Sequence, residues 1–520
     1  MQFCQIETDN EIMDVLFISP GNNKAIYQEL ANKYAAIEPP TWSLLLAQSC
    51  RSIGYKVGIC DVNAEQLSAK QVHERILQDN PRLICFVVYG QNVNAGTVNM
   101  SGSVYLSTYL KGKDVNIPIC YIGSHVQALP HRTLKDEPSI DFIFTNEGVY
   151  ALRNILSLSE IDINNLDGIK GIGWRKNGKV ILNQPEAIVP GERMDEDLPG
   201  YAWDLLPYKE APLDLYRAPM WHVEYDESKR TPYAAIQTSL GCQFGCEFCM
   251  INIINRNDND EIGVAGNYSF MRHWSPEFII KEFDKLTALG VFTIKITDEL
   301  FLFNKKYYKP LCETLSKRPY VDKLTMWAYS RIDTVRDPEL LSLVRSAGIK
   351  WLALGIESGE KTVRLEVSKG KFQDVDIKRV VQQVHDADIN VMANFIFGLP
   401  GDNHESMTKT LELSKELCTL GWNAYTAMAL PGSQLYKNAI MSGVELPKTY
   451  EQYSFLSYDT LPLPTDKCTA GEILKFRDEA YVDYHTYEPF LELVQRKHGQ
   501  SRVDAIKQMT KVKLKRKLYE

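Results

Sequence analysis

Short apolar runs alternate with amphipathic stretches along the first third of the chain. Runs rich in β-branched residues predict strands, and stretches with one polar face, such as 42–53 and 98–110, predict helices between them. Strands that are apolar throughout are typical of a parallel sheet with helices on both faces. The five predicted strands are 13–19, 56–62, 83–88, 117–122 and 141–145.

Five strands in this arrangement suit a doubly wound, Rossmann-like sheet with the order 2-1-3-4-5. Such a sheet binds its ligand beyond the carboxyl ends of the strands. A G-x-G-x-x-G motif does not follow the first strand, which disfavours a dinucleotide. The strand-end loops are small and polar, and we expect their residues to contact a ligand: Ser19, Pro20, Tyr89, Gly90, Gln91, Gly123, Ser124, His125, Asn146, Glu147 and Gly148.

The stretch 161–232 separates this first domain, 1–160, from the next one. It contains a predicted hairpin over 171–182 with Asn177 and Gly178 at its turn, and then a Pro-punctuated segment that we interpret as an ordered linker.

Strand and helix patterns resume at 233. Six βα units over 233–435 predict an open, partial (β/α)6 barrel, whose chemistry would lie at the carboxyl ends of the strands. The predicted strands are 233–238, 292–297, 323–328, 350–354, 390–397 and 422–427. Polar residues or glycine follow four of these strands, namely Asp298, Glu299, Ser330, Arg331, Glu357 and Gly398. Taken singly, each of these positions also has a purely structural explanation, as a helix cap, a surface ion pair or a turn.

The region 436–520 has helical patterns, at 470–484 and 503–518, and includes the basic run 511–517. A basic run can bind nucleic acid, but the solvated face of an amphipathic helix is the interpretation we favour.

Composition limits the class of protein. The 520 residues predict two or three domains, and a formal net charge of −8 argues against a general nucleic-acid binder. The first residues lack the pattern of a signal peptide, and we find no apolar run of membrane-spanning length. Cys60, Cys85 and Cys120 lie in strand-like runs, which suggests free thiols in a reducing cytoplasm.

Three cysteines follow the first barrel strand, at Cys242, Cys246 and Cys249. This C-x3-C-x2-C spacing lets three thiolates hold one face of an iron–sulfur cube and leaves one iron open. A structural zinc site needs a fourth ligand, usually in a second pair, and none follows closely. Zinc and unpaired core cysteines remain the alternatives.

The motif C-x3-C-x-Phe-C resembles that of the radical S-adenosylmethionine (SAM) enzymes. The resemblance implies a 4Fe–4S cluster whose open iron binds SAM. It also implies that Asp298 and Glu299 contact the amino group of SAM, that Ser330, Arg331 and Glu357 hold its carboxylate and ribose, and that Phe248 and Gly398 flank its adenine. The chain departs from the family's Gly-Gly-Glu form at Asp298-Glu299.

The first domain resembles the cobalamin-binding domain that precedes the radical barrel in one branch of this family. The matching stretches are 38–42, 60–65, 123–130 and 146–148. A flavodoxin-like regulatory domain without a cofactor is the alternative. The Asp-x-His-x-x-Gly motif that supplies a cobalt ligand in many cobalamin proteins is missing. We therefore expect cobalt without a protein imidazole, and we interpret His125 as a loop residue near the edge of the cofactor.

The resemblance implies a cobalamin-dependent radical methyltransferase. A deoxyadenosyl radical would remove a hydrogen from an unactivated carbon, and methylcobalamin would supply the methyl group. It implies a small-molecule substrate, such as a natural product, lipid or tetrapyrrole, and an electron donor such as flavodoxin or ferredoxin. A cyclase or oxidative rearrangement without methyl transfer is the first alternative, and a non-catalytic corrinoid or redox sensor is the second.

Overall fold

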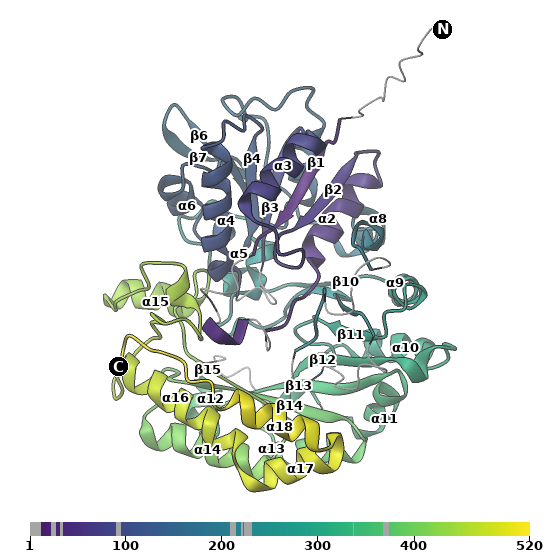
Figure 1. Ribbon diagram of the computed structural model, residues 1–520, viewed down its shortest axis with the longest axis vertical. Coiled ribbons are helices and arrows are strands. Elements are labelled where there is room, and N and C mark those ends of the chain that lie inside the picture. The colour runs from purple at the N-terminus through teal and green to yellow at the C-terminus, as the bar shows by residue number, and fades with distance from the viewer. Residues whose placement is uncertain are drawn as a thin grey trace.

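The computed structural model describes residues 12–21, 26, 28–31, 35–89, 95–208, 215–219, 222, 231–335, 337–367 and 374–519. Two layered α/β units lie one above the other, with the N-terminal unit at the top and the last helices beneath the lower sheet (Figure 1). This arrangement confirms the predicted fold class: a doubly wound sheet, a partial barrel and a helical C-terminal region.

The upper sheet has the strand order β2-β1-β3-β4-β5-β6-β7. The first five strands are parallel, and their order is the predicted 2-1-3-4-5. The predicted hairpin forms as β6–β7 and adds to the sheet antiparallel to β5, a position that its sequence did not indicate. The bounds are β1 (Val15–Ser19), β2 (Val57–Asp61), β3 (Leu83–Val88), β4 (Ile119–Gly123), β5 (Phe142–Phe144), β6 (Ile172–Lys176) and β7 (Lys179–Leu182).

Helices cover both faces of this sheet, which explains why its central strands are apolar throughout. Phe17 and Cys85 belong to the core that includes α2 (Thr41–Arg51) and α7 (Val149–Leu156). Their neighbours Leu16 and Phe86 belong to the core on the other face, which includes α3 (Ala69–Asp79) and α4 (Gly96–Lys111). The shorter helical elements are η1 (Gln28–Ala31), α5 (Ser124–Ala128), α6 (Pro130–Asp136), η3 (Gly191–Arg193), α8 (Met194–Asp197) and η4 (Trp203–Leu205).

The described part of the predicted linker packs against both units. The Trp203 indole donates to Glu282 of the barrel at 3.0 Å, and the Tyr201 hydroxyl donates to the Gln237 carbonyl at 3.0 Å. A buried ion pair between Glu147 and Arg272, at 2.7 Å, joins the units again. The rest of the linker prediction, at 209–214, 220–221 and 223–230, lies outside the described residues.

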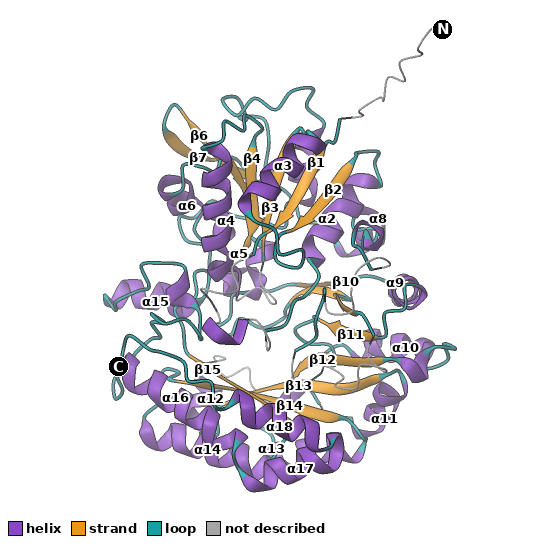
Figure 2. Ribbon diagram, in the orientation of Figure 1, coloured by secondary structure: helices purple, strands orange, loops and turns teal. Residues whose placement is uncertain are grey.

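The lower sheet consists of six parallel strands in the order β15-β14-β13-β12-β11-β8, which confirms the partial barrel (Figure 2). Its strands are β8 (Tyr233–Ile236), β11 (Thr293–Ile296), β12 (Thr325–Arg331), β13 (Ile349–Glu357), β14 (Asn390–Phe397) and β15 (Gly421–Thr426). Its helices are α9 (Pro276–Ala288), α10 (Lys305–Leu315), α11 (Pro338–Ser346), α12 (Lys361–Glu366), α13 (Ile377–Asp386) and α14 (His404–Leu417). A small antiparallel pair, β9 (Ser239–Gly241) and β10 (Met271–His273), lies between β8 and α9 in the sequence.

Four helices follow the barrel: α15 (Gln434–Ser442), α16 (Ala470–His485), α17 (Glu488–His498) and α18 (Gln500–Met509). The prediction of a helix over 503–518 was wrong beyond Met509. Like charges at i,i+4 spacing, as at Lys511 and Lys515, disfavour a helix there. The segment instead carries a fully buried Arg516, so the expected solvated helix face is also wrong at that residue.

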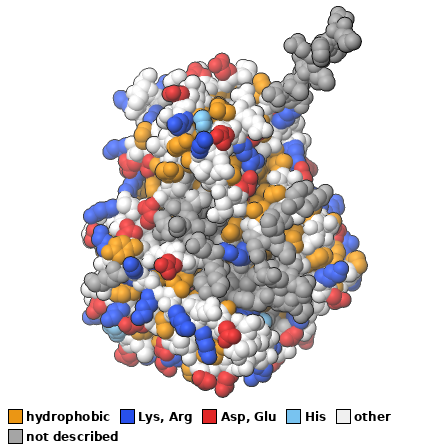
Figure 3. Space-filling view, viewed as in Figure 1, with side chains coloured by type: hydrophobic (Ala, Val, Ile, Leu, Met, Phe, Trp, Pro, Cys, Tyr) orange, Lys and Arg blue, Asp and Glu red, His pale blue; other side chains and the backbone are white. Residues whose placement is uncertain are grey.

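Among the described helices, none is both long and apolar enough to cross a membrane. On the face in Figure 3, acidic and basic side chains are interspersed over both units. This mixture agrees with the modest formal net charge of −8.

Candidate functional site

The loop that carries the three cysteines leaves β9 through Gly241. Gly241 has φ +80°, and a Cβ atom there would lie 2.1 Å from the Phe270 carbonyl oxygen. Asn252, which the sequence analysis did not single out, fixes the loop from inside: it accepts from the Cys242 amide at 2.7 Å and donates to the Phe244 carbonyl at 2.9 Å. The loop is therefore held in shape by its own residues.

Backbone amides contact two of the sulfur atoms, while no group of three His, Cys, Asp or Glu side chains in the described part of the chain is arranged to hold a metal ion. The Phe244 amide donates to Cys242 Sγ at 3.4 Å, and the Ile251 amide donates to Cys249 Sγ at 3.5 Å. Such N–H···S bonds stabilise thiolates and tune iron–sulfur clusters. Burial raises the pKa of the Cys242 thiol to about 12, with Cys246 adding to the effect. Burial likewise raises the pKa of Cys246 to about 11. The thiols therefore interact, and bound iron would supply the positive charge that their thiolate forms need.

Two acidic side chains lie beside the cysteines, each at the end of a barrel strand. Burial raises the pKa of Glu299 to about 7, and Lys295 acts against that shift. Burial raises the pKa of Glu357 to about 7 as well, and here Arg331 opposes it. Glu357 has φ +66°, and the β13–β14 register shifts beside it. Backbone strain of this kind at a non-glycine residue is common at ligand sites.

The predicted pair Asp298 and Glu299 divides into two different positions. Both carboxylate oxygens of Asp298 accept hydrogen bonds, from the Thr238 amide and hydroxyl and from the Ser239 hydroxyl, at 2.5–2.6 Å. Glu299 instead lines the cavity described below. Asp298 thus fixes the turn before the cysteines, whereas Glu299 faces the cavity, and contact of either residue with SAM stays a prediction.

Ser330 and Arg331 are the last two residues of β12, and both make contacts that hold the surroundings of the site in place. The Ser330 hydroxyl accepts from the Leu302 amide at 3.1 Å. Arg331 makes two hydrogen bonds to the buried Asp333, at 2.6 and 2.7 Å, and its guanidinium stacks 3.7 Å from the centre of the Phe244 ring. Arg331 also lowers the pKa of Cys246, against the larger effect of burial. Arg331 therefore lies between the cysteine loop and the strand ends.

We expect replacement of Arg331 with alanine to weaken SAM binding more than it reduces cluster content. Losing a charge-assisted contact costs about 1.5–3 kcal/mol, which is roughly ten- to a hundredfold in affinity. Equilibrium dialysis with SAM and iron analysis of the same preparation check this. Unchanged affinity together with lost iron would instead assign Arg331 to support of the cysteine loop, through Phe244.

Phe248 and Gly398 lie on the same side of the barrel. Phe248 packs against a small apolar cluster that includes Val363, Ile396 and Leu399. Gly398 has φ +80°, and the Asp402 carboxylate accepts from its amide at 3.1 Å. A Cβ atom on Gly398 would lie 2.7 Å from the Ile473 side chain of α16, so packing requires glycine there, and the adenine contacts stay a prediction.

A cavity of about 210 Å³ lies between the two units, more than ten times the space that one water molecule needs. Its upper wall comes from strand-end residues of the first sheet, and its lower wall from strand-end residues of the barrel. The upper residues include Ser19, Pro20, Asp61, Asn63 and Tyr89, and the lower ones Gln237, Thr297, Glu299 and Tyr329. The carboxyl ends of both sheets therefore face one shared space.

The other predicted residues of the first domain lie elsewhere or outside the described residues. Gly90 and Gln91 belong to the latter group. Gly123 is required by packing, since a Cβ atom there would lie 2.2 Å from the Val88 carbonyl oxygen. Ser124 is buried at the start of α5. In the loop 146–148, Asn146 accepts from the Gly148 amide and Glu147 accepts from the Val189 amide.

His125 is buried away from the shared cavity. Its Nδ1 lies 3.2 Å from the Thr97 hydroxyl, its ring meets Tyr450 edge-on, and burial lowers its pKa to about 3. We expect cob(II)alamin bound to the whole chain to give an electron paramagnetic resonance spectrum without axial-nitrogen splitting. Clear splitting that disappears in His125→Ala would contradict this prediction and identify His125 as the ligand.

Two cavity residues, Glu38 and Asp61, lie in the stretches 38–42 and 60–65 that resemble the cobalamin-binding domain, but the sequence analysis gave neither of them a role. Glu38 forms a buried ion pair with Lys295 at 2.8 Å. Asp61, whose pKa burial raises to about 7, accepts from the Tyr216 hydroxyl at 3.2 Å. Lys295 is a charged residue in the otherwise largely apolar strand β11, which indicates a buried partner, but that partner, Glu38, lies in the other unit.

Comparisons with known proteins agree with this geometry. Residues 236–414 match the radical SAM superfamily, and residues 28–156 match the B12 binding domain. An uncharacterized methyltransferase of Pyrococcus horikoshii is 23% identical, over 91% of this chain and 93% of its own length. An anaerobic magnesium-protoporphyrin IX monomethyl ester cyclase of Rubrivivax gelatinosus is 25% identical, over 98% of this chain and 84% of its own. The structure of the radical S-adenosylmethionine methyltransferase TsrM of Kitasatospora setae, with cobalamin and a 4Fe–4S cluster bound, has a TM-score of 0.62 at 16% identity and covers 84% of this chain and 76% of that one.

Proposed function

Because the chain belongs to the cobalamin-dependent radical S-adenosylmethionine enzymes, we propose that it methylates an unactivated carbon of a small molecule. The radical SAM domain implies a 4Fe–4S cluster and SAM, and the B12 binding domain implies cobalamin. When bound, these groups supply a deoxyadenosyl radical and a transferable methyl group. The protein's part is to hold, orient and shield them.

Each set of residues has one task in this proposal. Cys242, Cys246 and Cys249 hold the cluster. Glu299, Ser330, Arg331 and Glu357 bind the polar groups of SAM, and Phe248 and the Gly398 loop take its adenine. Ser19 and Pro20 at the end of β1 and Tyr89 after β3, which line the cavity, contact cobalamin.

The observation that carries the proposal is the shared cavity. Tyr89 and Asp61 of the cobalamin side line the same space as Glu299 and Tyr329 of the barrel side. A substrate in that space would meet both halves of the chemistry, hydrogen removal and methyl delivery. An electron donor such as flavodoxin or ferredoxin and a cytoplasmic location belong to the proposal as well.

Isotope labelling tests methyl transfer directly. With SAM labelled on its methyl group, we expect label first on cobalamin and then on the product. Anaerobically reconstituted protein is incubated with cell extracts, and mass spectrometry should find a product heavier by one CH2. One deoxyadenosine and one S-adenosylhomocysteine should form per product.

A cyclase or rearrangement is the second candidate, and the similarity to the Rubrivivax gelatinosus cyclase over 98% of this chain favours it. Deoxyadenosine with product but without S-adenosylhomocysteine would establish it in place of methyl transfer. A chain that binds a corrinoid but never cleaves SAM would instead be a corrinoid or redox sensor.

A further inference from the structure

One wall of the shared cavity comes from a loop that belongs to neither sheet. Tyr453, Ser454, Phe455 and Leu456, here called the wall, line the cavity and lie between α15 and α16 in the sequence. Tyr453 ends a single turn, η9 (Glu451–Tyr453), and the other three residues lie in the loop after it, outside any strand or long helix. The position of the wall therefore depends on what holds it from behind.

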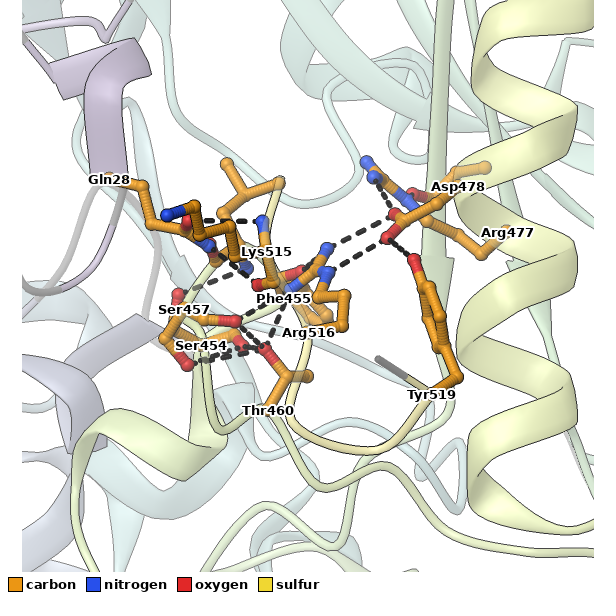
Figure 4. A network of polar contacts seen from close by, with 12 residues as sticks. Gln28, Ser454, Phe455, Ser457, Thr460, Arg477, Asp478, Lys515, Arg516 and Tyr519 are labelled. Carbon is orange, nitrogen blue, oxygen red and sulfur yellow. Dashed lines mark hydrogen bonds and ion pairs between the residues drawn. The ribbon is translucent and has the colours of Figure 1, made fainter. Parts of the chain in front are cut away.

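The chain's last residues hold the wall, as Figure 4 shows. Arg516 is fully buried and extends its guanidinium between α16 and the wall. It donates to the Phe455 carbonyl at 2.8 Å, the Ser457 carbonyl at 2.7 Å and the Thr460 hydroxyl at 2.9 Å. Two further bonds join it to Asp478 of α16, at 2.8 and 3.1 Å. Every N–H group of the guanidinium is thus hydrogen-bonded, either to the loop that contains the wall or to Asp478.

Asp478 is itself fixed by its neighbours. It accepts from Arg477 at 2.9 Å and from the Tyr519 hydroxyl at 2.8 Å. Arg477 also donates to the Ala424 carbonyl of β15 at 2.8 Å. The contacts therefore run from the last barrel strand, through α16 and Arg516, to the wall.

A second set of bonds ties the wall to the N-terminal unit. Gln28 donates to the Leu456 carbonyl at 2.7 Å and exchanges hydrogen bonds with the backbone of Lys515 at 3.2 Å. The Ser454 hydroxyl donates to the Ile26 carbonyl at 2.9 Å. Ile26 lines the cavity too, so these bonds close its rim from both units.

The wall presents mainly apolar groups and reaches toward the SAM side of the barrel. The Phe455 ring lies 5.0 Å from the Tyr425 ring, and Tyr425 packs in the apolar cluster of Phe248. Tyr453 packs with Ile26 and Val98 on the cobalamin side. The wall thus spans the interval between the two proposed cofactor sites.

We propose that residues 515–519 form a clasp that fixes the cavity wall, with Arg516 as the positioning residue for a substrate with an apolar or aromatic face. The clasp keeps the wall closed over the cavity and excludes water from the space where a radical would form. The proposal rests on the proposed function only in calling the cavity a substrate site.

Hydrogen–deuterium exchange of the full chain tests the clasp without any substrate. In Arg516→Ala, we expect the amides of Tyr453, Ser454 and Leu456 to exchange about a hundredfold faster, because removing one partner of a buried ion pair opens the local structure. Peptides from β3 and β13 should keep their protection. Lys513→Ala removes an exposed cation three residues before Arg516, and its wall amides should exchange at the same rate as in the parent protein.

Hydroxocobalamin probes the cobalamin side of the wall, where Tyr453 packs with Ile26 and Val98. We expect it to dissociate about tenfold faster from Arg516→Ala, with Arg516→Lys between the two because it keeps the charge and loses the planar donors. A second variant keeps the test usable if Arg516→Ala does not fold. Gln28→Ala removes the hydrogen bonds to Leu456 and Lys515 from a partly exposed position, and the same wall amides should exchange faster in it.

Wall amides that exchange at the unchanged rate in both variants would overturn the clasp. Loss of protection spread equally over β3, β13 and the wall would also overturn it, because Arg516 would then serve general stability. Failure to bind hydroxocobalamin at all would count against the proposed function, while the exchange result would still decide the clasp.

Discussion

Replacing Cys242, Cys246 and Cys249 together with alanine should abolish the brown absorbance of the reconstituted protein and all formation of deoxyadenosine from SAM. Each thiolate is proposed to hold one iron of the cluster. Burial raises the pKa values of the three thiols, so their thiolate forms depend on bound metal. Absorbance spectra, iron analysis and chromatography of SAM products under dithionite measure the effect.

A matched control is Cys312→Ala. Cys312 is buried in α10 of the same barrel, in the apolar core and away from the cysteine loop. It should keep both the absorbance and the SAM cleavage. The triple variant should also keep the circular dichroism of the parent, since the cysteine loop contributes little to either sheet. A triple variant that still cleaves SAM would end the radical interpretation.

The arrangement of the parallel strands in both sheets was predictable because it follows from local pattern and topology. Continuous apolar strands separated by helices are compatible with few sheet topologies. The right-handedness of connections between parallel strands excludes most of these. The runs at 83–88 and 390–397 coincide with β3 and β14, because most residues of both strands are buried and apolar. The cysteine loop was predictable for a similar reason: its ligands are close in sequence.

What the sequence did not reveal are contacts between distant segments. Glu38 and Lys295 are separated by 257 positions, and nothing local marks them as partners. Asp298 and Glu299 are adjacent acidic residues with different surroundings. Asp298 accepts hydrogen bonds from Thr238 and Ser239, whereas Glu299 faces the cavity. Arg516 stands among lysines that are exposed, so its burial could not be read from the run itself.

Lys295→Ala should destabilise the protein by about 3–5 kcal/mol, because it leaves the Glu38 carboxylate buried without its ion-pair partner. The side chains of Lys295 and Glu38 are only 2% and 9% exposed. The Lys295 ammonium lies 2.8 and 3.0 Å from the two carboxylate oxygens and 5.0 Å from the Trp327 ring. The Tyr233 hydroxyl adds a hydrogen bond to Glu38 at 3.3 Å. Urea unfolding, followed by circular dichroism, gives the free-energy change.

Two further variants separate the charge from the packing. Lys305→Ala breaks an exposed pair with Asp337, where the side chains are 58% and 32% exposed, and should cost at most about 1 kcal/mol. The double variant Glu38→Gln with Lys295→Met removes both charges while keeping similar volumes, and it should recover most of the lost stability. A double variant as unstable as Lys295→Ala would mean that the ammonium stabilises the protein through the Trp327 and Tyr329 rings rather than through Glu38. Because Glu38 lines the cavity and Lys295 opposes the raised pKa of Glu299, loss of the pair should also weaken SAM binding, whereas Lys305→Ala should leave it unchanged.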